Sequence, residues 1–192
     1  GGSFWITQQS GIVIDDGSAL GNLTVNILSI EIYNVHLFIG AGAGGFQYDG
    51  VTGLLTGIDT TNATGFLVSG ASLDLAIISE TTGALRSWTG ISADVSSMSV
   101  VGFGSDFSLT INNLSLLMNI AASDASKLDW DDLTTDGSVI GFDGLLSSLD
   151  LQIGGQLELS ISSYVFVGGS FWITQQSGIV IDDGSALGNL TV

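Results

Sequence analysis

Apolar and polar residues alternate with a period of two along most of the chain. Successive side chains of a strand point to opposite faces, so this period predicts β-strands with one apolar and one polar face. The polar positions carry mostly Ser, Thr, Asn and Asp. The alternating segments are 28–39, 72–77, 107–111, 149–153, 157–162 and 164–167. No long amphipathic helix is written in the chain, and the sequence therefore predicts an all-β fold.

Glycine marks the turns between these segments, because the chain has 28 Gly and no Pro. Asp-Gly dipeptides favour the two-residue hairpin turn, whose central residues have positive φ. Turns are predicted at 16–17, 49–50, 136–137, 143–144 and 154–155. The glycine-rich run 40–45 is expected to form a corner. A short helix is expected only within 123–127 or 130–133.

An exact internal repeat joins the two ends of the chain. The segment 168–192 is identical to the segment 1–25, without a mismatch. Two interpretations account for the repeat. One is a cloning artefact, and the other is that the chain is a segment of a tandem array whose period is the offset from Gly1 to Gly168. In the second case, 1–167 is one complete repeat unit and 168–192 is the beginning of the next, identical unit. The β character continues from 164–167 into Gly168 without a linker, which favours a continuous structure.

Composition and charge exclude several classes of function. The chain has 2 basic and 19 acidic residues and a net charge of −17. Two cations are too few for binding to a nucleic-acid backbone or a polybasic membrane contact. The chain has no Cys and one His, so thiol chemistry and Cys/His zinc sites are excluded. No apolar run is long enough for membrane insertion of this segment as a helix. The negative charge is expected to keep extended arrays dispersed.

Several apolar, glycine-rich phrases carry a family resemblance. They are NVHLFIGAG at 34–42, FLVSGASLDLAII at 66–78, SADVSSMSVVGFG at 92–104 and YVFVGGSFWIT at 164–174. They resemble repeats of very large, acidic, repetitive bacterial surface proteins, a largely uncharacterised family. The resemblance implies secretion to the cell surface, an extended multi-repeat architecture and no enzymatic activity.

These observations predict a β-solenoid-like or continuous stacked-sheet tandem repeat, or as an alternative a string of β-sandwich or barrel domains. The predicted function is structural: an extended extracellular filament or surface stalk, for instance in a biofilm matrix. The predicted partners are neighbouring copies of the same repeat, in one covalent array or in a polymer. The alternative function is a calcium-stabilised adhesin extender whose ligand-binding domain lies elsewhere. We expect no catalytic residues, since paired carboxylates with a basic partner are missing.

The densest acidic run is the candidate cation site. Asp129, Asp131, Asp132 and Asp136 are weighed as calcium ligands, because hard cations prefer several carboxylate and carbonyl oxygens. Their spacing does not fit an EF-hand loop, and a solvated acidic turn is the other interpretation. No other cofactor is expected.

The aromatic residues near the repeat boundary are the candidate inter-repeat junction. They are Phe4, Trp5, Tyr164, Phe166, Phe171 and Trp172. Trp5 and Trp172 are predicted to occupy equivalent environments. The scattered aromatics are expected to pack in a core rather than to form a carbohydrate platform; they are Phe4, Trp5, Trp88, Phe103, Trp130 and Tyr164. His36 is expected to lie in phase with Ile30, Ile32 and Phe38 on one strand face, as a partly buried or face-lining residue with no catalytic role.

Overall fold

All regular elements of the described chain are β-strands, so the all-β prediction is confirmed. The computed structural model describes residues 2–15, 17, 20–135, 142–181 and 190–191. The long strands are β1 (Ser3–Asp15), β2 (Leu23–Ala41), β5 (Thr64–Glu80), β6 (Ser87–Val101), β7 (Phe107–Ile120), β9 (Leu149–Ile161) and β10 (Val165–Gln176). The short strands are β3 (Gly45–Tyr48), β4 (Leu55–Asp59), β8 (Thr134–Thr135), β11 (Val180–Ile181) and β12 (Leu190–Thr191).

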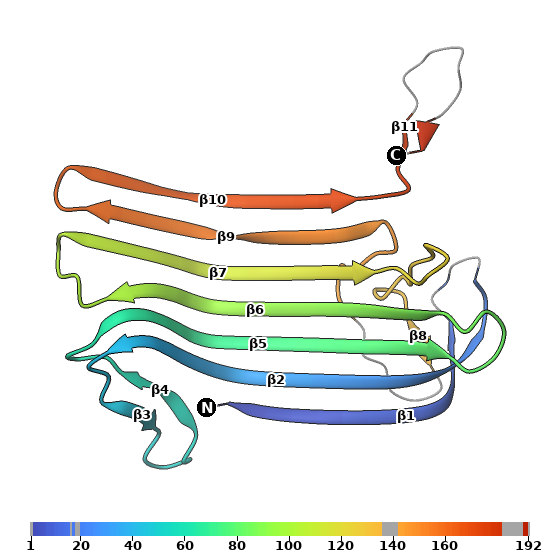
Figure 1. Cartoon of the computed structure of the whole chain (residues 1–192), viewed down its shortest axis with the longest axis horizontal. Coiled ribbons are helices and arrows are strands. Elements are labelled where there is room, and N and C mark those ends of the chain that lie inside the picture. The colour runs from blue at the N-terminus through green and yellow to red at the C-terminus, as the bar shows by residue number, and fades with distance from the viewer. Residues whose placement is uncertain (1, 16, 18–19, 136–141, 182–189, 192) are drawn as a thin grey trace.

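The long strands form one open antiparallel sheet, a single layer in Figure 1. The strand order is β10-β9-β7-β6-β5-β2-β1-β8, and every ladder between neighbours is antiparallel. The small β3-β4 hairpin projects from one end of the sheet (Figure 1). The described strands do not close into the coils of a solenoid, and that finer prediction is unconfirmed.

The predicted turns agree with the structure only in part. The corner at 40–45 is confirmed, since β2 ends at Ala41 and β3 begins at Gly45. The turns at 49–50 and 143–144 are also present, whereas 123–127 and 130–133 form no helix. The turn predicted at Gly154–Gly155 is wrong, because β9 runs straight through both glycines. The Asp-Gly pairs at 16–17 and 136–137 include residues that lie outside the described residues.

One face of the sheet is almost entirely aliphatic. Residues directly opposite one another in a ladder share a face, so ladder partners trace rows across the strands. Two such rows are Phe4–Ile32–Leu73–Ala93–Leu116–Ile153–Ile173 and Ile6–Ile30–Leu75–Ile91–Met118–Leu151–Gln175, in which Gln175 is the one polar residue. A third row, Leu37–Val68–Met98–Ile111–Leu157, shares this face because β9 alternates without interruption from Leu151 to Leu157. These three rows define the apolar face.

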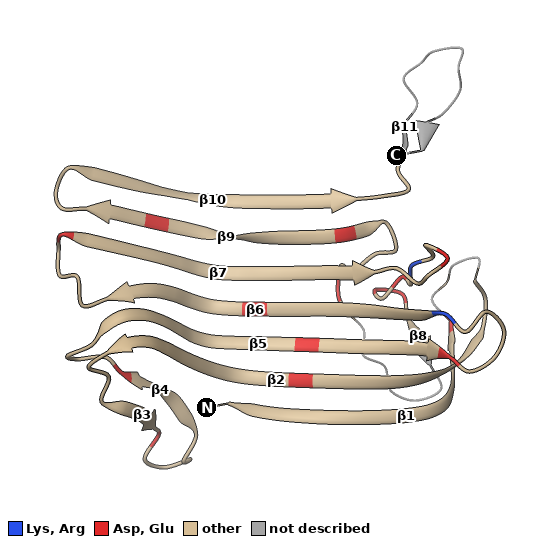
Figure 2. Cartoon of the chain, viewed as in Figure 1, with Lys and Arg blue, Asp and Glu red and all other residues tan. Residues whose placement is uncertain are grey.

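The opposite face carries the acidic side chains of the strands. One of its rows is Trp5–Glu31–Asp74–Ser92–Leu117–Gln152–Thr174. Asp94 and Glu158 alternate with residues of the apolar face and therefore point to the same side as this row. Figure 2 shows acidic positions near the middle of β2, β5 and β6, whereas Glu158 lies nearer the end of β9. We call this side the charged face.

A line of irregular positions crosses the inner strands and changes their phase. Asn34, Gly70 and Asn113, on β2, β5 and β7, have positive φ. The register of β5 against β2 and of β9 against β7 shifts at these positions, as expected for an extra residue in a strand. The shift moves His36 to the charged face, so the prediction that it is in phase with Ile30 and Ile32 is wrong.

The buried core lies under one end of the charged face only. The segments 122–135 and 142–149 fold over this end, and their side chains pack against β1, β2, β5 and β6. Trp88 and Trp130 are fully buried, which confirms the core prediction for these two residues. It is wrong for Phe4, Trp5, Phe103 and Tyr164, all of which are exposed. The core residues are Ile14, Val25, Ile27, Ala76, Ile78, Trp88, Ala122, Leu128, Trp130, Leu133, Phe142, Leu145 and Leu149.

Candidate inter-repeat junction

Because of the exact repeat, the same sequence occurs in two strands of the sheet, β1 and β10. The segment 170–176 of β10 is identical to the segment 3–9 of β1. The small β11-β12 ladder pairs Val180 with Thr191 and Ile181 with Leu190. The first copy has the equivalent pairs, Val13 with Thr24 and Ile14 with Leu23. The second copy therefore pairs with itself as the first copy does.

The two copies expose complementary edges. The outer edge of β1 is paired only at Ile14 and Asp15, which contact β8, among the described strands. The second copy uses this same edge, since β10 pairs along its length with β9. The edge of β10 that corresponds to the β1–β2 pairing has no neighbour among the described strands. Each copy thus shows the pairing that the other lacks.

Two aromatic side chains of β10 lie over two glycines of β9. Trp172 is directly opposite Gly154, and Phe171 is opposite Gly155. A Cβ atom on Gly154 would lie 2.0 Å from a ring carbon of Trp172, and one on Gly155 would lie 3.2 Å from the ring of Phe171. Adjacent residues point to opposite faces, so one aromatic–glycine pair lies on each face of the sheet. Aromatic rings that cover a cross-strand glycine fix the register of the two strands.

The first copy of this tryptophan has a different neighbour. Trp5 packs against Tyr33 of β2, with ring centroids 5.8 Å apart and the planes tilted by 59°. A hydrogen bond with Asp74, burial, and the charges of Asp74 and Glu31 raise the pKa of Tyr33 to about 12. Trp5 and Trp172 are 56% and 63% exposed, so both keep a large open surface. The environments of the two tryptophans differ in this chain, because Trp5 has its neighbour on β2 and Trp172 has its neighbour on β9.

The other residues of the predicted junction lie elsewhere on the sheet or at its end. Phe4 lies on the apolar face of β1 and is 68% exposed. Tyr164 lies in the β9–β10 turn and Phe166 near the start of β10, and both are strongly exposed. Phe171 and Trp172 therefore lie opposite β9 in the ladder, whereas Phe4 and Trp5 lie on the edge strand β1. Tyr164 and Phe166 lie at the end of the sheet where β9 connects to β10.

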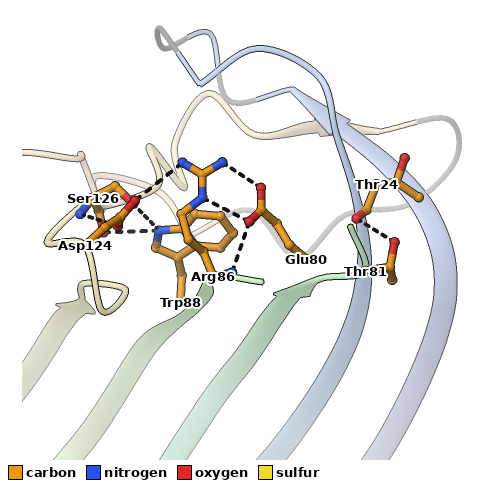
Figure 3. A network of polar contacts seen from close by, with 7 residues as sticks. All are labelled: Thr24, Glu80, Thr81, Arg86, Trp88, Asp124 and Ser126. Atoms are coloured by element: carbon orange, nitrogen blue, oxygen red, sulfur yellow. Dashed lines mark hydrogen bonds and ion pairs between the residues drawn. The ribbon is translucent and has the colours of Figure 1, made fainter. Parts of the chain in front are cut away.

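Both basic residues tie the segment 122–135 to the strands of the sheet. Arg86 donates from Nε and Nη2 to the two carboxylate oxygens of Glu80, at 3.0 and 2.6 Å, and pairs with Asp124 at 3.7 Å (Figure 3). Its guanidinium lies 5.2 Å from the centre of the Trp88 ring. Hydrogen bonds from Arg86 lower the pKa of the Glu80 carboxyl. Lys127 pairs with Asp150 at the start of β9.

Further polar contacts satisfy buried groups beneath the same segment. The indole N–H of Trp88 donates to the carbonyl of Ser126 at 3.1 Å, and that of Trp130 donates to Oδ1 of Asn119 at 3.0 Å. Asn119 in turn donates to the carbonyls of Leu128 and Leu146. Since both cations of the chain are used at this end, the middle of the charged face keeps its acids without a basic partner.

The acidic run predicted to bind calcium lies in the segment 122–149. Asp131 accepts a hydrogen bond from the backbone N–H of Gly144 at 2.5 Å, and Asp129 lies 3.4 Å from the hydroxyl of Ser147. Within the part of the chain that the structure describes, no three acidic, His or Cys side chains gather into a metal-binding group. Asp136 lies outside the described residues, so calcium at this run stays a prediction.

His36 lies on the charged face and contacts a residue of its own strand. Its Nε2 lies 3.0 Å from Oδ1 of Asn34, one of the residues with positive φ. Burial lowers the pKa of the His36 ring. Its place beside the irregular position of β2 is consistent with a role in shaping the strand.

Gly154 and Gly155 are the part of the junction that sequence reasoning misses. A Gly-Gly pair is interpreted as a turn, although the alternation keeps its phase across this one: positions 149, 151 and 153 are apolar, and so are 157, 159 and 161. A hairpin turn has no reason to preserve that phase, and an unbroken strand must preserve it. The phase is the signal for a single strand.

Comparison with protein families, curated proteins and solved structures found no match. None of the described segments forms a helix with the length and hydropathy needed to span a bilayer.

Proposed function

We propose that this chain is a segment of a structural filament in which tandem repeats share one uninterrupted antiparallel sheet. In this arrangement β10 is the first strand of the following repeat, and β1 pairs with the last strand of the preceding one. The observation that carries the proposal is the pairing of the second copy of the repeat with β9, along the edge that the first copy leaves open.

The register of the sheet supports a continuous lattice. Following ladder partners from Trp5 across the sheet leads to Thr174, which is the second copy of Thr7. Each repeat therefore offsets the strands by two residues, an even number that keeps the apolar side chains of every repeat on one face. An odd offset would turn the face over at each junction.

The strand count gives the dimensions of such a filament. Six long strands of the large sheet lie within one repeat: β1, β2, β5, β6, β7 and β9. At a spacing of about 4.8 Å between strands, each repeat extends the filament by about 29 Å. A covalent chain with hydrogen-bonded strands across every junction has no flexible linker, so the array resists bending and stretching. Edge strands remain only at the two ends of the array.

The place of this filament outside the cell is part of the proposal. It rests on the resemblance to repeats of large, acidic bacterial surface proteins. The net charge of −17 supports it, because mutual repulsion keeps long acidic filaments dispersed and hydrated.

Chains with two, three and four copies of the unit 1–167 test the proposal by small-angle X-ray scattering. A shared sheet predicts that the maximum dimension grows by about 29 Å per repeat. A string of separate compact domains of this size adds about 40 Å or more per repeat and shows flexibility between units. Aligned filaments of the shared sheet should also give a meridional reflection near about 4.8 Å. Growth at the larger increment, without that reflection, would overturn the proposal.

A further inference from the structure

The apolar face is an extended hydrophobic surface that no described strand covers. Every strong strand-to-strand contact of the long strands is between neighbours within the sheet. Residues of this face keep much of their surface in solvent: Ile6 is 61% exposed and Leu37 is 47% exposed. A sheet with one apolar face normally buries it against another layer, and exposed apolar patches of more than a few hundred Å² mark interaction sites.

The size of the face is sufficient for a stable interface. The three rows continue on the same side into Val35–Ala71–Val95–Leu114, Ile39–Phe66–Val100 and Leu109–Leu159, so one repeat carries about 26 apolar side chains there. Each side chain covers about 33 Å² of a sheet, from spacings of about 4.8 Å between strands and about 6.8 Å along a strand. The apolar side chains of one repeat thus offer about 860 Å², against about 800 Å² per partner in a standard interface.

The chemistry of the face favours a second copy of this chain as its partner. Apart from Gln175 on β10, at the end of one row, the three rows that define the face contain no charged and no hydrogen-bonding side chain. A face of this kind is complementary to itself, and a two-fold axis pairs it with its own copy in a closed dimer. The acids of the charged faces, such as Glu31, Asp74 and Asp94, then point outward, on the two surfaces farthest from each other, where water solvates them.

We propose that two copies of the chain pack their apolar faces together to form a two-layered β-sandwich. In an array, whose existence rests on the proposed function, two filaments would pair along their whole length. Both present the same face at the same interval of about 29 Å and with the same two-residue offset, so every repeat finds an equivalent partner. The pairing of two single chains does not depend on that array.

The test compares two neighbouring residues of β6 that point to opposite faces. Ala93 lies on the apolar face and Ser92 on the charged face, and both are partly buried in the single chain. The chain has no Cys, so A93C and S92C each supply one unique thiol. Sedimentation should give a closed dimer of twice 19.7 kDa for both variants. When about 90% of the chain is paired, maleimide labelling of A93C should be about tenfold slower than in diluted monomer, since only the unpaired fraction reacts. S92C should label at the same rate in both states.

A second pair of variants tests the same interface by charge. Ile91→Lys places a cation on the apolar face and should give a monomer, whereas Ser92→Lys on the other side of the same strand should leave the dimer intact. If Ile91→Lys does not fold, the cysteine pair still decides the question.

The outcomes separate face-to-face pairing from association by other routes. A monomer in which A93C and S92C label alike at every concentration overturns the pairing. Protection of A93C only when neutral phosphatidylcholine vesicles are added would assign the face to a lipid surface instead, and would also overturn it. Open-ended polymers that persist in Ile91→Lys would show association through the sheet edges, which supports the proposed filament and overturns the paired faces.

Discussion

Replacing Gly154 with alanine is expected to loosen β10 from β9, the pairing that represents the repeat junction. The new Cβ would lie 2.0 and 2.2 Å from two ring carbons of Trp172. Carbon atoms in contact are normally about 3.5–4.0 Å apart, so the ring must move by about 1.5 Å or change its rotamer. Crowding of this kind typically costs about 1–3 kcal/mol.

The other contributions can be bounded from the same geometry. Trp172 is 63% exposed, so its neighbours cover roughly a third of its surface. For a side chain of about 250 Å², the covered area is about 90 Å². If the ring leaves Gly154 altogether, about 2 kcal/mol of burial is lost at about 25 cal/mol per Å². The change from Gly to Ala within a strand returns about 0.5–1 kcal/mol. The net loss is about 1–2 kcal/mol, a factor of about 5–30 in the opening equilibrium of β10.

Hydrogen exchange of the β10 amides that bond to β9 measures this opening directly. Gly169→Ala on β10 is the matched control, since its Cβ would meet no atom within 4 Å. The double variant Gly154→Ala/Trp172→Ala completes a mutant cycle, in which removal of the ring should abolish the cost of the alanine. The reasoning is refuted if Gly154→Ala protects the β10 amides as well as the native chain does, or if its cost persists without Trp172.

Three further predictions concern the covered end of the charged face. Glu80→Gln should lower the free energy of unfolding by about 3 kcal/mol, because it leaves the largely buried Arg86 without its carboxylate; urea denaturation measures this, and a loss below about 1 kcal/mol would contradict it. The pKa of Glu80 is lowered in the folded chain, so the stability that it contributes is present above its ordinary pKa near 4.5 and is lost as the pH falls through the folded value. In denaturant titrations from pH 6 to pH 3, the native chain should therefore lose more stability than Glu80→Gln, and equal losses would argue against the ion pair. Trp130→Phe should cost about 2–3 kcal/mol, since it removes the N–H that Asn119 accepts and leaves a small cavity; an unchanged urea midpoint would count against that contact.

The alternation of the sequence predicts the strands but misjudges how two of them continue. It assigns the segments 149–153 and 157–162 to separate strands, since a Gly-Gly pair ordinarily marks a turn. In the structure the pair lies within β9, where the rings of Phe171 and Trp172 occupy the space that side chains would fill. The sequence alone does not show this, because the rings come from a strand whose register is set by the whole ladder.

The phase of β2 shows the same limit. Counting by twos from Ile30 places His36 among the apolar positions, whereas the extra residue near Asn34 moves it to the charged face. A residue with positive φ inside a strand is a local choice that depends on the neighbouring strands, which carry their own irregular positions at Gly70 and Asn113. Period-two reasoning holds only between such positions.

The sequence by itself determined the strand content, the amphipathic alternation, the acidic surface and the exact repeat of 1–25 at 168–192, because these depend on composition, order and side-chain direction along one strand. The tertiary structure decided which edge each copy of the repeat uses, that the sheet remains open in one layer, and that the apolar rows join into one face. These features follow from pairings between residues far apart in the chain, such as Gly154 with Trp172 and Trp5 with Glu31. Hydrogen bonding between backbones is the same for every register, so only the packing of the assembled side chains selects one.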